Sequence, residues 1–249
     1  NKRNSLLVII GFVVFITLVS WIFAQVLDYG LAGVGVGLIF AGLTSFTSYY
    51  WSDKIILSIS GARPASKEKN FKFYTVTENL SLAVQLPKPQ LYIIEDSAMN
   101  AFAAGRDPKH AVICVTTGLL KKLDRSELEG VIGHELSHIK NYDMRLMSLV
   151  AVLVGLVTLL ADWFLRGWSL TRKRQEKKDV GIILTVLAVF LALLSPLIAN
   201  LIKLAISRRR EFLADAGSVM ITRQPSGLIS ALEKLEKDNL YEVLKKRIS

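Results

Sequence analysis

Two long stretches without a charged residue constrain the fold of this chain more than any other feature of the sequence. Residues 4–27 and residues 29–52 each form an uncharged run of 24 residues. A helix rises about 1.5 Å per residue, so each run is long enough to cross a hydrocarbon layer about 30 Å thick. The first run is also too long for a cleaved signal peptide, and a second one follows it at once. The sequence therefore predicts two transmembrane helices.

Two later apolar stretches extend this prediction to four crossings. Residues 146–161 form an uncharged run of 16 residues, and residues 180–202 form one of 23. We expect both stretches to cross the membrane as helices. The loop between them, which would then face outward, contains six basic residues, whereas basic loops favour the cytoplasmic side. A hairpin of these two segments that does not fully cross therefore stays open as the alternative.

The distribution of basic residues predicts the orientation and the partners. Lys54, Arg63 and neighbouring lysines follow the second stretch, and Lys203 and the arginines at 208–210 follow the fourth. We expect both regions on the cytoplasmic side of the inner or plasma membrane, in a multi-pass protein whose partners include membrane lipids. Attraction to anionic headgroups explains the net charge of +10 more simply than nucleic-acid binding, because no basic stripe with interleaved aromatics is present. The single cysteine, Cys114, fits a reducing compartment.

A His-Glu-x-x-His pattern at 134–138 predicts a metal site. Residues four apart lie on the same face of a helix, so His134 and His138 can direct two imidazole nitrogens to one zinc ion. Glu135 lies beside that ion and is the candidate general base, which takes a proton from water and passes it to a leaving amine. Asp124 and Glu127 form a plausible capping box for a helix from about Arg125 to Asn141. A chance pair of surface histidines is the alternative.

A hydrolytic zinc site needs a third protein ligand, and the segment 207–215 offers one. Glu211 and Asp215 lie four residues apart, so a helix would place both carboxylates on one face. We assign Glu211 as the third ligand of a single zinc ion. Asp215 would accept a hydrogen bond from a ligand histidine, His134 in our assignment, and fix its tautomer. On spacing alone, a solvated helix with ordinary ion pairs would be the preferred interpretation of this segment.

These residues carry a family resemblance over nearly the whole chain. The run from His134 to Asn141 with Asp143 after it, the Ser-Arg-x-x-Glu-x-x-Ala-Asp segment at 207–215, and Asn100-Ala101-Phe102-Ala103 upstream occur together in this chain. In this the chain resembles the HtpX family of membrane zinc metalloproteases, which are of the gluzincin type and are related to the CAAX prenyl proteases. The resemblance supports Glu211 as a ligand.

The resemblance implies a zinc-dependent endopeptidase that cleaves misfolded or damaged membrane proteins. Its partners would be membrane-protein or unfolded polypeptide substrates. Asn100, Ala101, Phe102 and Ala103 would lie on an edge strand that pairs with an extended substrate, so that main-chain hydrogen bonds bind many sequences alike. Arg208 would hold the carboxylates of the site or help to stabilise the oxyanion.

The resemblance and the local patterns together predict the fold class. Helical periodicity covers Phe71 to Leu86, strand-like runs cover Leu91 to Glu95 and Ala111 to Thr116, and residues 213–249 are mainly helical. We expect a mainly α membrane protein with four transmembrane helices and a cytoplasmic, zincin-like α+β metalloprotease domain with a small sheet. Its four parts would be two transmembrane helices at 4–52, a cytoplasmic segment at 53–145 with the His-Glu-x-x-His helix, two membrane helices with a basic loop at 146–206, and a cytoplasmic helical segment at 207–249.

The site should lie close to the membrane surface. His138 precedes Leu146 by eight residues, so one continuous helix would separate the metal ligand from the third apolar stretch by about 12 Å. Cleavage is therefore expected in cytoplasmic loops or membrane-proximal segments of a substrate.

One family feature is missing, and other functions stay open. Family members continue with a Thr-His-Pro sequence that this chain does not contain, and His110 cannot replace it because Asp107-Pro108-Lys109-His110 predicts an exposed turn. The alternatives are a CAAX-type prenyl-protein processing protease and a zinc-binding scaffold without catalysis, although a scaffold would not need Glu135. A transporter is disfavoured, because the apolar stretches almost lack ionisable residues.

Overall fold

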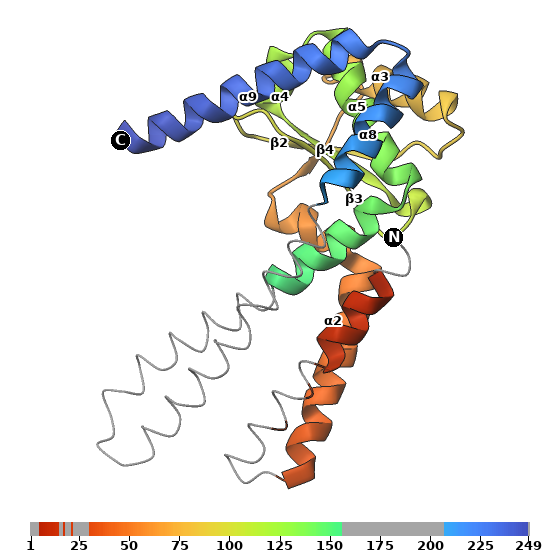
Figure 1. Cartoon of the computed structure of the whole chain (residues 1–249), viewed down its shortest axis with the longest axis vertical. Coiled ribbons are helices and arrows are strands. Elements are labelled where there is room, and N and C mark those ends of the chain that lie inside the picture. The colour runs from red at the N-terminus through yellow and green to blue at the C-terminus, as the bar shows by residue number, and fades with distance from the viewer. Residues whose placement is uncertain (1–4, 15–16, 18–20, 22–29, 156–206, 249) are drawn as a thin grey trace. The chain divides into compact units, whose positions relative to one another are not determined.

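A computed structural model of the chain describes residues 5–14, 17, 21, 30–155 and 207–248 (Figure 1). The chain divides into two compact units. The first consists chiefly of Trp51–Ser148 and Ser207–Ser249. The second consists of Lys2–Tyr50 and Leu149–Ile206. The division into four parts at 4–52, 53–145, 146–206 and 207–249 stays a prediction.

Helices account for the described parts of the apolar stretches. Residues 5–14 are helical, and helix α2 (Gly30–Ile59) covers nearly all of the second stretch and departs from helical geometry at Trp51, with φ −121° and ψ 20°. Residues 143–155 are also helical, whereas residues 156–161 and the whole fourth stretch at 180–202 lie outside the described residues. Within the part of the chain that is described, no helix combines the length and the apolar character needed to cross a membrane.

The first unit contains a small mixed sheet of four strands in the order β1-β2-β4-β3. Strand β2 pairs parallel with β4, and the other two pairs are antiparallel. The strands predicted at 91–95 and 111–116 are confirmed to within one residue. The bounds are Arg63–Pro64 for β1, Gln90–Ile94 for β2, Ala101–Ala104 for β3 and Val112–Thr116 for β4.

Helices make up most of the remaining first unit. Helix α5 lies at its centre and packs against three other helices, α3, α8 and α9, and also against β3. The helix predicted at 71–86 is confirmed, although it ends three residues early at Ala83. The bounds are Phe71–Ala83 for α3, Thr117–Lys122 for α4, Arg125–Lys140 for α5, Arg208–Thr222 for α8 and Pro225–Ile248 for α9, with a short 3₁₀ helix, η1, at Pro108–His110.

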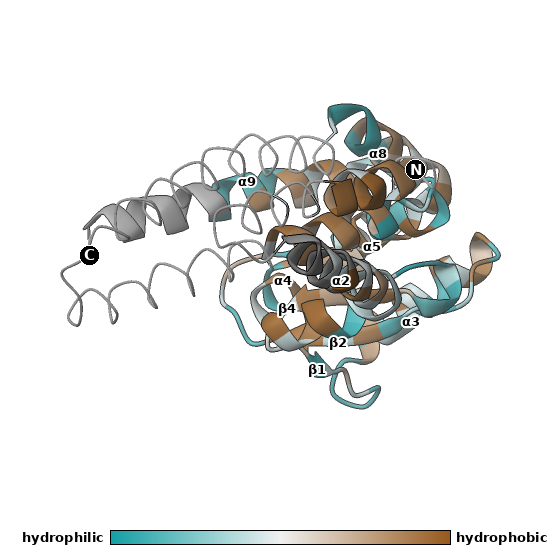
Figure 2. Ribbon diagram, turned by 90° about the horizontal axis from the view of Figure 1, so that it is seen from below, coloured by the Kyte–Doolittle hydropathy of each residue, from teal (hydrophilic) through white to brown (hydrophobic). Residues whose placement is uncertain are grey.

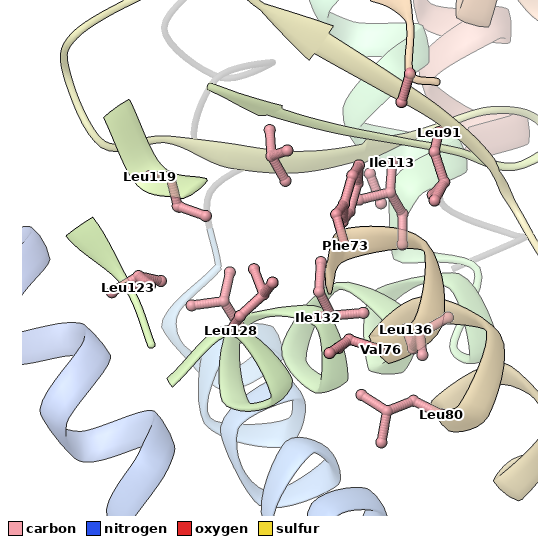
Figure 3. Packing of buried hydrophobic residues seen from close by; sticks show 14 of the residues in the cluster. Phe73, Val76, Leu80, Leu91, Ile113, Leu119, Leu123, Leu128, Ile132 and Leu136 are labelled. Atoms are coloured by element: carbon pink, nitrogen blue, oxygen red, sulfur yellow. The ribbon is translucent and has the colours of Figure 1, made fainter. Parts of the chain in front are cut away.

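The two faces of the sheet lie against different apolar clusters, because side chains alternate along a strand. Ile113 of β4 faces the main core, where α3 contributes Phe73 and α5 contributes Ile132, each fully buried (Figure 3). Cys114, its neighbour on β4, faces a smaller cluster that includes Leu57 of α2. Burial raises the pKa of the Cys114 thiol to about 12. Cys114 is therefore a buried side chain whose thiol is protonated.

A complete capping box begins α5. The Asp124 carboxylate accepts a hydrogen bond from the Glu127 backbone N–H at 2.9 Å, and the Glu127 carboxylate accepts one from the Asp124 N–H at 2.8 Å. Glu127 also accepts hydrogen bonds from Ser230 at 2.6 Å and Lys234 at 2.7 Å, both on α9. Burial acts to raise the pKa of Glu127, but these hydrogen bonds outweigh it, and the pKa is lowered. The start of α5 is therefore held both locally and by α9.

Replacing Asp124 with Ala should lower the free energy of unfolding by about 1 kcal/mol, because the Glu127 N–H loses its acceptor at the helix start. Chemical unfolding in detergent, followed by circular dichroism, would measure this loss. Glu129→Gln is the matched control, because Glu129 makes only a partly exposed ion pair with Arg125. That variant should change stability by less than about 0.5 kcal/mol. Equal losses in both variants would contradict the role of the cap.

Candidate metal centre

Two histidines and a glutamate from separate helices meet at one point. His134 and His138 lie on α5, and their Nε2 atoms are 3.1 Å apart. Glu211, in the first turn of α8, places Oε2 at 3.6 Å from the His134 Nε2 and 3.7 Å from the His138 Nε2. Among the described residues, these three side chains form the one cluster that could hold a metal ion. The residues predicted as ligands are thus brought together by the fold.

The hydrogen bonds of the two imidazoles indicate that a cation belongs between them. The Nδ1 atom of His134 lies 2.9 Å from Oδ1 of Asp215, and the Nδ1 atom of His138 lies 3.1 Å from Oδ2 of Asp143. A carboxylate only accepts hydrogen bonds, so each Nδ1 donates, and each Nε2 is the nitrogen left to face the other ring. The two Nε2 atoms are 3.1 Å apart and converge on one point. A metal ion at that point would be bound by both nitrogens.

The distances also suit a tetrahedral ion. Bonds of about 2.0–2.1 Å to nitrogen and oxygen ligands in a tetrahedron place neighbouring ligand atoms about 3.3 Å apart. The three separations observed here, 3.1, 3.6 and 3.7 Å, bracket this value. With three protein ligands the fourth position stays open, which is the arrangement of catalytic sites. The site residues therefore fit a divalent metal ion.

Small residues allow α8 to approach α5 closely enough for Glu211 to reach the histidines. A Cβ atom at Gly217 of α8 would lie 2.1 Å from the hydroxyl oxygen of Ser137 on α5. Nearby, the Ser218 hydroxyl donates a 2.6 Å hydrogen bond to the backbone carbonyl of Gly130 on α5. Both contacts join α8 directly to α5. They therefore set the position of α8 along α5 and its distance from the His-Glu-x-x-His segment.

Asp143 is a site residue for which the sequence alone predicted no role. Helix α5 ends at Lys140, and Tyr142 adopts the left-handed region with φ 58° before a new helix starts at residue 143. One continuous helix therefore does not run from His138 to Leu146, so the helical rise from which the separation of about 12 Å was derived does not apply. The turn folds Asp143 back onto His138, where its side chain is only 2% exposed. The other carboxylate oxygen lies 3.9 Å from Nε of Arg210.

This hydrogen bond changes the electrostatics of His138. Burial alone disfavours the charged ring, but the bond to Asp143 and the nearby carboxylates outweigh burial and raise the pKa of His138. The carboxylate thereby makes the ring a stronger electron donor, which is also what a metal ligand requires. Each ligand histidine thus has its own orienting carboxylate, from α8 for His134 and from the turn after α5 for His138.

Glu135 lies between the ligand cluster and strand β3. Its side chain is buried, and burial raises the pKa of Glu135, although the two histidines act in the opposite direction. The backbone N–H of Ala103 donates a hydrogen bond to its carboxylate. The candidate base is therefore in direct contact with the predicted substrate strand.

Strand β3, at Ala101–Ala104, occupies the edge of the described sheet, as the family resemblance implied for residues 100–103. The Asn100 carbonyl accepts a hydrogen bond from the Thr116 N–H, and Phe102 stands opposite Cys114 in the antiparallel register. Bonding positions alternate in such a pair, so Phe102 bonds toward β4. The main-chain groups of Ala101 and Ala103 then face the open edge, which agrees with the bond from Ala103 to Glu135.

Two other predicted positions lie outside this cluster of contacts. Arg208 is exposed in the first turn of α8, and it is Arg210 that lies beside a site carboxylate, that of Asp143. His110 belongs to η1, where Asp107 caps the turn and the His110 side chain is 49% exposed. The prediction of an exposed turn at 107–110 is confirmed.

Comparisons with known proteins decide the family. A model described as "Peptidase family M48" matches residues 67–243. The chain belongs to this family. Among curated relatives, a "Protease HtpX homolog" of Thermoanaerobacter pseudethanolicus is 45% identical over 239 residues, covering 94% of this chain and 80% of the relative. One of Dictyoglomus thermophilum is 43% identical over 238 residues, covering 96% and 78%. The resemblance to HtpX proteases is confirmed, and the chain is an M48 metalloprotease.

A solved structure supports the fold. The crystal structure of Ste24p of S. mikatae matches 89% of this chain with a TM-score of 0.52 and 20% sequence identity. The match covers 55% of the Ste24p chain, so this M48 protein spans about half of that longer protein. At this identity the likeness concerns the fold, a small mixed sheet with mostly helical content.

Replacing Asp143 with Asn should weaken metal binding about 10- to 100-fold, because the carboxylate that orients the His138 ring loses its charge. Asp215→Asn should have a similar effect through His134. Competition with a fluorescent chelator would measure the affinity of each purified variant. Glu95→Gln, a change at an exposed acidic residue after β2, is the control and should leave the affinity unchanged. Wild-type affinity in both aspartate variants would contradict this assignment.

Replacing Gly217 with Ala should displace α8 and weaken metal binding, because the new methyl group would overlap the Ser137 side chain. Adding Ser137→Gly should restore metal affinity, since the Ser137 Cα lies 4.0 Å from the position of the new methyl group and only its side chain obstructs it. The double variant should be about as stable as the wild type, because the glycine only moves from α8 to α5 and the helix cost of about 1 kcal/mol per glycine nearly cancels. Unchanged metal affinity in the single variant would show that the contact does not set the site.

Proposed function

We propose that this M48 protein is an integral membrane, zinc-dependent endopeptidase. The observation that carries the proposal is the placement of Glu135, which follows a ligand histidine and contacts the open edge strand through Ala103. The donor set of two imidazoles and one carboxylate is typical of catalytic zinc sites. A peptide bond held along β3 would therefore lie next to both the ion and the base.

The residues of the chain have distinct tasks in the proposed reaction. An extended substrate pairs with the outward C=O groups of Ala101 and Ala103 and with the Ala101 N–H, because the Ala103 N–H already bonds to Glu135. His134, His138 and Glu211 hold a zinc ion, which when bound polarises the scissile carbonyl and lowers the pKa of water. Glu135 takes a proton from the attacking water and delivers it to the departing amine. Its raised pKa, a consequence of burial, favours the uptake of that proton from water.

The mode of substrate binding supports a role in the quality control of membrane proteins. Main-chain pairing at β3 makes few demands on the substrate sequence, which suits an enzyme for misfolded or damaged chains. The uncharged runs at 4–27 and 29–52 support membrane insertion, and the basic residues after them support a site on the cytoplasmic side. Substrates would be unfolded or membrane-proximal segments. Arg208 is proposed to contact the carboxylates or the oxyanion once substrate is bound.

Prenyl-protein processing is the second candidate, and the similarity to Ste24p is the observation that favours it. A peptide substrate tested with and without a C-terminal prenyl group separates the two functions. Equal cleavage of both forms supports the general endopeptidase, whereas cleavage of the prenylated form alone supports CAAX-type processing. A non-catalytic zinc scaffold would cleave neither form.

Changing Glu135 to Gln should abolish cleavage and leave metal binding intact, because the amide cannot accept the proton from water. Changing Glu211 to Gln should instead weaken metal retention, since a charged ligand is lost. The measurements are hydrolysis of an unfolded protein by the detergent-solubilised enzyme, with and without zinc, and the metal content of each variant after dialysis.

Glu129→Gln provides the matched control, because it makes the same chemical change on α5 away from the cluster. It should keep both activity and metal. Normal turnover by the Glu135 variant would refute the proposed mechanism, and normal metal content in the Glu211 variant would refute the ligand set.

A further inference from the structure

The loop between β2 and β3 determines where the edge strand begins, and α4 holds one side of it. The buried Thr116 hydroxyl donates a 2.6 Å hydrogen bond to the Ala98 carbonyl and accepts one of 3.0 Å from the Asn100 N–H. The Gly118 N–H donates to the Asp96 carbonyl at 2.8 Å. A Cβ atom at Gly118 would lie 2.1 Å from the Ser97 carbonyl oxygen, so the loop lies directly against the start of α4.

Helix α9 holds the other side of the same loop. The carboxylate of Asp238 accepts a hydrogen bond from the Met99 backbone N–H at 2.7 Å. Its second oxygen pairs with the ammonium group of Lys122 on α4, which also donates to the Ser97 carbonyl at 3.3 Å. The Asp238 side chain is only 10% exposed, so water competes little for these bonds. One carboxylate from a distant helix thus fixes the residue that precedes Asn100.

The turns of α9 that precede Asp238 bond to α5, the helix that carries the two histidines. Ser230 and Lys234 bond to Glu127, the third residue of α5, and Leu228 and Ala231 are buried. Both hydrophilic and hydrophobic stretches are visible along the first part of α9 (Figure 2). Because four residues separate Lys234 from Asp238, about one helical turn links the attachment to α5 with the attachment to the loop. Helix α9 therefore connects the element that carries the histidines to the element that starts the substrate strand.

We propose that Asp238 is a positioning residue for substrate, which fixes the register of strand β3 relative to the metal-binding helix α5. This inference rests on the proposed peptidase function and extends it to a residue outside the metal site. Asp238 acts through the Met99 N–H and sets the position of Ala101 and Ala103. Without this carboxylate, the start of the strand is less ordered. An extended peptide must then order the strand as it binds, which lowers the affinity for the peptide. The ligands and Glu135 belong to α5 and α8 and keep their places.

The test compares Asp238→Ala and Asp238→Asn with the wild type on an internally quenched peptide of about ten residues, chosen from a protein that the enzyme cleaves. Asp238→Ala should raise KM about tenfold and leave kcat and metal content nearly unchanged. Asp238→Asn should have a smaller effect, because its amide oxygen still accepts the Met99 N–H. Hydrogen–deuterium exchange of residues 97–104, in the full chain, should be faster in Asp238→Ala.

Glu233→Gln, an exposed change on the same helix, is the matched control and should leave KM and exchange unaltered. A fall in kcat with unchanged KM, or loss of metal, would overturn the positioning role. So would unchanged exchange at 97–104. If Asp238→Ala does not fold, Asp238→Asn and Lys122→Met decide the same question. If the wild type cleaves no peptide, the proposed function fails, and the exchange measurement still decides whether Asp238 holds the strand.

Discussion

The close contact between α5 and α8 is the constraint on which the site depends. The packing of the chain itself holds the three candidate ligand atoms 3.1–3.7 Å apart. Gly217 against Ser137 and Ser218 against Gly130 supply that packing, since larger side chains would separate the helices. Helix α5 is in turn anchored in the buried core, where Ile132 and Leu136 are fully enclosed.

Local patterns in the sequence predicted the parts of the structure that local forces determine. The capping box at Asp124 and Glu127 satisfies backbone groups within one turn, so it favours a helix start there before any tertiary contact forms. The same holds for the i, i+4 pairs of the site, whose members share a helix face by geometry alone. Strands β2 and β4 were also predictable, because continuous apolar runs such as 111–115 favour buried strands.

Contacts that depend on the tertiary fold were not predictable in this way. Asp143 reaches His138 only because Tyr142 adopts a left-handed conformation, which the sequence does not signal. Arg210, and not Arg208, lies beside that carboxylate, since the direction of each side chain on α8 follows from how the helix packs. Asp238 and Met99 are 139 positions apart, so no local pattern connects them.

Different elements hold the two halves of the proposed catalytic site. Helix α8 and the turn after α5 orient the candidate ligands through Asp215 and Asp143, whereas the end of β4 and α9 hold the start of the edge strand through Thr116 and Asp238. Glu135 is the residue that touches both halves, because it follows a ligand histidine and accepts the Ala103 N–H. Under the proposed mechanism, metal affinity and peptide affinity can therefore vary separately within one fold, and a change at Glu135 should act on the chemical step.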